Sequence, residues 1–107
     1  METSIAYTDA GPVSVTVLYR RGKIIVHRSL AFKNRYMVTQ EPTCLAITDE
    51  FLTQGGAKRF ADFVSRTAVA NLLDPQSAKD LPRAVRSAVK RKARTIHQRE
   101  MAIWHDR

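Results

Sequence analysis

The sequence of 107 residues contains one cysteine, no long hydrophobic segment and no acidic residue between Arg83 and Arg99. Because Cys44 is the single cysteine, a disulfide bond within the chain is excluded. No apolar run approaches the roughly 20 residues of a transmembrane helix, so we expect no membrane association of that kind. Residues 1–5 lack the basic and apolar regions of a signal peptide, and together these absences predict a cytoplasmic protein.

Residues that could hold a metal ion or catalyse a reaction are few and scattered. His97 and His105 are eight residues apart, which is too far along a helix for two ligands of one ion. Gly55-Gly56 does not match the phosphate-loop pattern GxxxxGK[ST]. Asp49 and Glu50 are neighbouring carboxylates, but capping of an expected helix start explains them. We therefore predict no metal site, no cofactor, no catalytic residue and no enzymatic activity.

The first half of the chain is predicted to form strands. A content of 44% hydrophobic and 26% charged residues is typical of a folded chain, and the length predicts a single domain over residues 1–107. Alternating or β-branched segments predict strands at residues 13–19, 24–28, 35–39 and 43–47, after a polar lead-in that ends at Gly11-Pro12. Gly22 should allow a tight turn, and Lys33-Asn34 marks another turn.

The second half, residues 48–107, is predicted to be mainly helical. Apolar residues with a 3.6-residue period predict a helix from Ala57 to Leu72, with a break at Gly55-Gly56 before it. A last helix should run from Leu81 to His105, with Asp80 as its N-cap. At 1.5 Å per residue it would span about 36 Å, so it should project, bend or meet a partner. The predicted fold class is α+β, a small antiparallel sheet of three or four strands followed by two main helices.

Positive charge is concentrated on the last helix. Residues 1–54 carry six basic and five acidic side chains, whereas residues 55–107 carry twelve and five. A helical wheel of the last helix places Lys92 and Arg99 on the apolar side. The apolar stripe consists of Leu81, Val85, Ala88, Val89, Ile96 and Ile103. The candidate nucleic-acid-binding residues on the opposite face are Arg83, Arg86, Lys90, Arg91, Arg94 and His97.

This basic face predicts a negatively charged partner. Arg86, Lys90 and Arg94 form like-charged i,i+4 pairs that no acidic residue in the segment relieves. We expect a non-catalytic accessory or regulatory protein that binds the phosphate backbone of DNA or RNA. One alternative is an inhibitor or adaptor that docks the helix on an acidic protein surface, and another is a small toxin-type ribonuclease. A membrane partner is disfavoured because the apolar stripe is mostly Ala and Val.

Two smaller features complete the candidate site. Arg20, Arg21 and Lys23 form a secondary basic set on the predicted strands, although Lys and Arg on edge strands commonly serve only to prevent aggregation. Ile103 and Trp104 end the last helix and are candidates for a partner contact, including a homodimer contact. No helix-turn-helix, RNP motif or zinc finger is present to define a mode of nucleic-acid binding.

Overall fold

The computed structural model describes residues 1–105, apart from the side chains of Trp104 and His105. The strands all precede the helices, and the fold is α+β as predicted. The strands are β1 (Thr3–Thr8), β2 (Gly11–Thr16), β3 (Tyr19–Arg21), β4 (Ile24–Arg28), β5 (Tyr36–Gln40) and β6 (Leu45–Ala46). The helices are α1 (Gln54–Val64) and α2 (Arg83–His105), separated by the 3₁₀ helices η1 (Ala68–Asn71) and η2 (Pro75–Asp80).

The central sheet is antiparallel with the strand order β3-β4-β5-β6. Strand β4 is its most buried strand, because both of its faces are covered. Ile24 and Val26 pack into the main core beneath α1, while Ile25 packs on the other side against Ala6 and Val15 of the β1–β2 hairpin. The alternation of side chains along one strand thus supplies both hydrophobic clusters.

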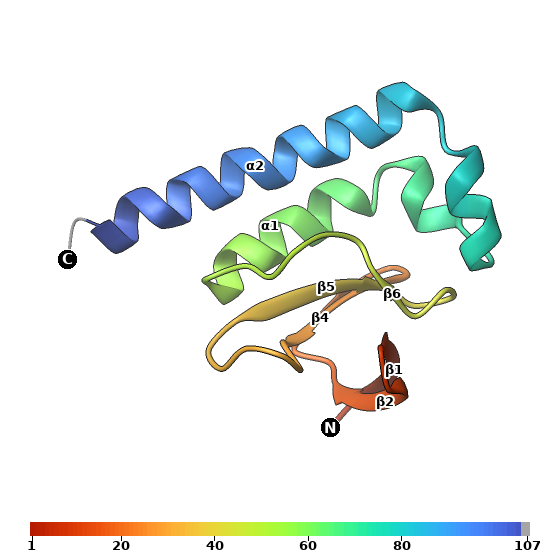
Figure 1. Cartoon of the computed structure of the whole chain (residues 1–107), viewed down its shortest axis with the longest axis horizontal. Coiled ribbons are helices and arrows are strands. Elements are labelled where there is room, and N and C mark those ends of the chain that lie inside the picture. Colours follow the sequence, from red (N-terminus) through yellow and green to blue (C-terminus); the bar gives the residue numbers. More distant parts are fainter. Residues whose placement is uncertain (106–107) are drawn as a thin grey trace.

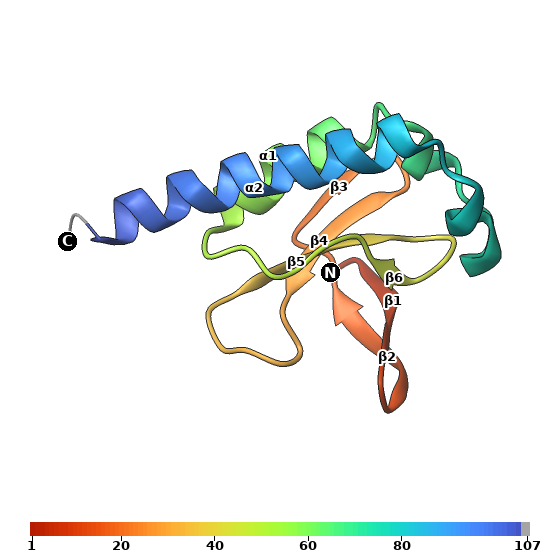
Figure 2. The same ribbon diagram turned by 45° about the horizontal axis from the view of Figure 1, so that its top comes forward.

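The elements are arranged in layers, with the hairpin, the sheet, α1 and α2 following one another (Figure 1). Helix α1 contacts β3, β4 and β5, and α2 contacts α1. A second view shows the C-terminal end of α2 extending past the other elements (Figure 2). Of the three outcomes expected for so long a helix, the structure shows projection. The outer face of α2 therefore forms one outer surface of the molecule.

The N-terminal residues depart from the predicted polar lead-in. Residues 3–8 form β1, which pairs with β2 in a hairpin whose turn is made possible by Gly11 at a φ of 109°. The predicted strand over residues 13–19 is divided, because the chain passes from one sheet to the other at Val17 and Leu18. The backbone N–H of Val17 donates to Glu2 in the hairpin, and that of Leu18 donates to Val26 in β4. The tight turn with Gly22 at a φ of 59° is confirmed.

Helix α1 begins at Gln54 and passes through Gly55-Gly56, so the predicted break there is wrong. The hydroxyl of Thr53 caps the helix by accepting from the N–H of Gly56 at 2.9 Å. The carboxylate of Glu100 in α2 accepts from the backbone N–H of Leu52 at 3.0 Å, and from the N–H and hydroxyl of Thr53 at 2.8 and 2.7 Å. A Cβ at position 56 would clash with the Glu100 carboxylate and would lie 2.9 Å from the Thr53 hydroxyl oxygen, so this close approach favours glycine.

The segment between the helices also differs from the prediction. Helix α1 ends at Val64, not at Leu72, because the Thr67 hydroxyl caps the separate helix η1. Asp74 caps η2, and Asp80 ends that helix instead of capping α2. Helix α2 begins after Pro82, whose carbonyl oxygen accepts from the N–H groups of residues 85 and 86. Helix η1 thus replaces the end of the predicted helix, and η2 leads the chain on to α2.

The two adjacent glycines of α1 give a matched pair of substitutions. Gly56→Ala should lower the free energy of unfolding by about 1–3 kcal/mol, because the new methyl group displaces the buried Glu100 carboxylate. Gly55→Ala meets nothing closer than Arg59 Nη1 at 3.7 Å, so it should be neutral or raise stability by up to about 1 kcal/mol. Urea denaturation of both variants measures the difference. Equal effects at the two positions would contradict the role assigned to Gly56.

His27 in β4 gives the fold a pH dependence. Its side chain is 2% exposed, its Nδ1 donates to the Arg28 carbonyl at 2.9 Å, and its Nε2 accepts from the Thr39 hydroxyl at 2.7 Å. Burial lowers the pKa of His27, since the charged imidazolium loses its hydration, and the bond to the Arg28 carbonyl only partly offsets this.

Stability should therefore fall when the pH is lowered through the window beneath the ordinary histidine pKa of about 6.5. In that window the unfolded chain binds a proton that folded His27 does not, so the folded state is fully favoured only at higher pH. Urea midpoints between pH 7.5 and 5 should decrease for the natural protein and decrease less for His27→Gln. The same slope in both proteins would show that other groups cause the effect.

Candidate nucleic-acid interface

Helix α2 is held by one apolar face. Val89, Ala93 and Ile96 are buried in the main core, and Leu81 and Val85 pack at its edge. The spacing of these residues follows the helical period, and it turns the opposite face of the helix outward. The core residue Ala93 was absent from the predicted stripe, and the predicted Ile103 lies beyond the core with 56% of its surface exposed.

The outward face carries five exposed cations. Arg83, Arg86, Lys90 and Arg94 follow one another along the helix, and Arg91 lies beside them. Within residues 1–105, the ion pairs that the structure forms belong to Arg20 and Arg21, and none involves these five side chains. We call these five residues the basic face. Its charges repel one another and have no acidic neighbour in direct contact.

The surface of the basic face is hollowed at two places. Arg83, Arg86, Ser87 and Lys90 surround a shallow hollow of about 310 Å³. A wider one of about 500 Å³ lies further along the helix, beside Lys90 and Arg94. Three cations and a hydroxyl around one small concavity match the donors that bind a phosphate group.

His97 does not belong to the basic face. Its Nε2 donates to the carbonyl of Glu50 at 3.1 Å, and its ring lies 4.6 Å from the ring of Phe51, centroid to centroid. The residue is half-buried and links α2 to the segment before α1. The helical wheel did not indicate this packing role. His97 also lines the wider hollow with Lys90 and Arg94, and its contact with a phosphate stays a prediction.

Glu100 in α2 has a structural role that no local pattern in the sequence indicates. It is 2% exposed, and its carboxylate faces the N-terminus of α1, where the helix dipole favours a negative charge. The Glu100 carboxylate therefore points to the interior and does not pair with the basic face. Lys92, on the inner side, places its ammonium 5.7 Å from the ring centroid of Phe63, while Arg99 is exposed.

The secondary basic set is largely engaged with carboxylates. Arg20 forms ion pairs with Glu2 at 2.5 Å and with Glu41 at 2.7 Å. The hydrogen bonds raise the pKa of Arg20 and lower the pKa of Glu41. Arg21 Nε lies 3.8 Å from Asp62, and Lys23 is exposed. Arg20 and Arg21 link the N-terminal segment, the sheet and α1 through these carboxylates, and none of the three residues lies on α2.

The end of α2 presents apolar surface. Met101 is 45% exposed and Ile103 is 56% exposed, while the side chain of Trp104 lies outside the described part of the structure. Among the described residues, no helix has the length and apolar character needed to cross a bilayer. The same residues contain no group of three His, Cys, Asp or Glu side chains placed to hold a metal ion.

Comparisons with protein-family models, with curated proteins and with solved structures found no match.

Proposed function

We propose that this protein binds nucleic acid without catalysis, by contacts between the basic face of α2 and the phosphate backbone. The observation that supports the proposal is the set of five exposed cations with no carboxylate partner among the described residues. A polyanion would relieve the repulsion among these side chains and release its own condensed counterions.

The dimensions of the basic face suit a phosphate backbone. Arg83 and Arg94 are eleven residues apart, which is about 16 Å along a helix. One strand of DNA carries a charge about every 3.4 Å of helix axis, so that length corresponds to about five phosphates. The number of available cations equals this number of phosphates.

The placement of the acidic side chains also supports the proposal. Glu2 and Glu41 pair with Arg20, Asp62 accepts from the Tyr19 hydroxyl at 2.5 Å, and Glu100 is buried against Thr53. These four carboxylates are bound on other elements or in the interior, so they do not repel an approaching polyanion at α2. Asp49 is exposed and lines the wider hollow beside Lys90 and Arg94, so it opposes anion binding at that hollow.

Binding to duplex DNA should depend steeply on salt. If about five phosphates are neutralised, the logarithm of the association constant should fall with the logarithm of salt at a slope of roughly −4 to −5. Fluorescence anisotropy with a labelled duplex measures this slope when the salt concentration is varied from about 50 to about 300 mM. Affinity that stays constant over the range would contradict electrostatic contact with the backbone.

Reversal of two charges at the centre of the basic face should remove binding. Arg86→Glu with Lys90→Glu should weaken duplex binding by at least about tenfold, because two attractive contacts become repulsive. Both side chains are exposed, so the free energy of unfolding should change by less than about 0.5 kcal/mol. Anisotropy and urea denaturation of the same preparation give the two quantities.

Lys33→Glu with Arg66→Glu is the matched control. It replaces one Lys and one Arg, both exposed, and produces the same net charge, but neither residue lies on α2. The control protein should keep most of the affinity. Equal losses in the two double variants would mean that net charge alone governs binding and would overturn the assignment to α2.

An acidic protein surface remains the second candidate for the partner. Exposed Met101 and Ile103 near the basic face give a combination of apolar and charged surface that protein interfaces use. In the anisotropy experiment, a protein that fails to bind either DNA or RNA at low salt would favour this alternative.

Self-association through the same end of α2 also stays a prediction, since a twofold pair would cover these side chains and double the basic surface.

A further inference from the structure

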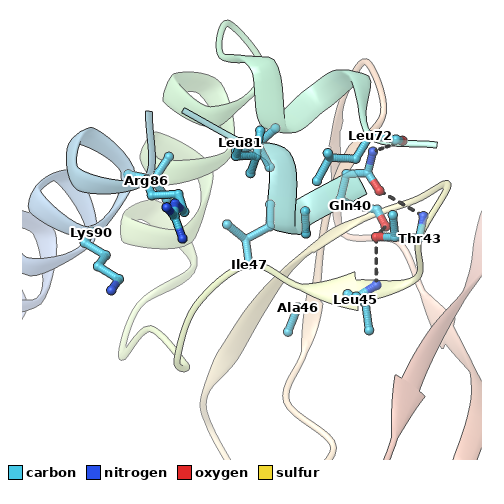
Figure 3. A pocket seen from close by; sticks show the side chains of 12 residues that line it. Gln40, Thr43, Leu45, Ala46, Ile47, Leu72, Leu81, Arg86 and Lys90 are labelled. Atoms are coloured by element: carbon cyan, nitrogen blue, oxygen red, sulfur yellow. Dashed lines mark hydrogen bonds between the residues drawn. The ribbon is translucent and has the colours of Figure 1, made fainter. Parts of the chain in front are cut away.

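An apolar pocket, distinct from the two hollows described above, lies beside the basic face. It has a volume of about 200 Å³, is partly open to solvent and is lined by the β5–β6 region, the 3₁₀ segments and the first turns of α2 (Figure 3). The apolar wall is formed by Leu45, Ala46, Ile47, Val69, Leu72, Ala78, Leu81 and Val89. The two charged residues that line it are Arg86 and Lys90.

The polar side chains in the wall are already hydrogen-bonded to the backbone. The amide nitrogen of Gln40 donates to the carbonyl of Leu72 at 2.6 Å, and its oxygen accepts from the N–H of Thr43 at 2.8 Å. The hydroxyl of Thr43 lies 3.4 Å from the Gln40 carbonyl and 3.3 Å from the N–H of Leu45. The interior therefore has little hydrogen-bonding capacity left for a ligand, and it suits a hydrocarbon group.

The charge of the pocket is confined to one side. Arg86 and Lys90 lie together on α2 at one end, and Gln40, Thr43 and Leu45 lie at the other (Figure 3). Both cations are exposed and have no ion-pair partner among the described residues. A guanidinium group binds a carboxylate through two parallel hydrogen bonds, so this end is complementary to a carboxylate.

We propose that this pocket binds a small carboxylate with an apolar body, such as an arylalkanoate. The hydrocarbon part occupies the space between Ile47, Leu72, Leu81 and Val89, and the carboxylate meets Arg86 and Lys90. The size is appropriate, since an apolar cavity of about 150 Å³ accommodates benzene and this one is larger by the volume of a short chain. Arg86 and Lys90 also belong to the basic face, so the ligand would occupy cations that the proposed function uses.

The test is a titration of the natural protein with three probes, without nucleic acid. 3-Phenylpropanoate should bind saturably and shift the methyl NMR signals of Ile47, Leu72, Leu81 and Val89. Its neutral amide has the same apolar body and should bind at least about tenfold more weakly, because the charge-assisted contacts are lost. Acetate has the charge without the body and should leave those methyl signals unchanged.

Two variants locate the charge contact. Arg86→Gln with Lys90→Gln should reduce the affinity for 3-phenylpropanoate to that of the amide, while Lys33→Gln with Arg66→Gln should leave it unchanged. Equal affinities of the acid and the amide for the natural protein, or methyl shifts that map elsewhere, would overturn the proposal. Because no nucleic acid is present, this result is independent of whether the proposed function is correct.

Discussion

The buried carboxylate of Glu100 connects the two halves of the helical layer. Removing a carboxylate from water costs several kcal/mol unless donors replace its hydration. Here the N–H groups of Leu52 and Thr53 and the Thr53 hydroxyl do so at 2.7 to 3.0 Å. The same contact satisfies N–H groups at the start of α1, fixes the distal part of α2 and leaves no room for a side chain at Gly56. The direction in which α2 projects depends on this contact.

The orientation of α2 in turn determines where the charge lies. With Val89, Ala93 and Ile96 held in the core, the helical period directs Arg83, Arg86 and Lys90 outward. Glu2 and Glu41 are used in the ion pairs of Arg20 and Glu100 is buried at Thr53, whereas exposed Asp49 lines the hollow beside Lys90 and Arg94. The basic face is therefore a product of the packing on the other side of the helix as well as of its own sequence.

Local patterns in the sequence predicted the α+β class, the strand β4, the turn at Gly22 and the five cations of the basic face. These predictions succeeded because each feature depends on the hydrophobic period or on a single residue type within one segment of the chain. They failed for Gly56 and His97, whose roles depend on partners 44 and 47 positions away, Glu100 and Glu50. The local patterns also missed β1. Ala6 is its buried residue, and the strand forms because β1 pairs with β2. Long-range contacts of this kind leave no periodic signal in the chain.

The layered arrangement also has a consequence for the approach of a charged partner. The basic face lies on the outer layer and the β1–β2 hairpin, with Glu2 at its start, lies on the opposite side of the sheet (Figure 1). A molecule with its charge displaced to one side has an electric dipole moment, and the field of a polyanion exerts a torque on it. Such a torque turns the molecule before contact and raises the fraction of productive collisions, at low ionic strength above all. If the proposed function is correct, the stacking order of hairpin, sheet and helices thereby influences the rate of association with the polyanion.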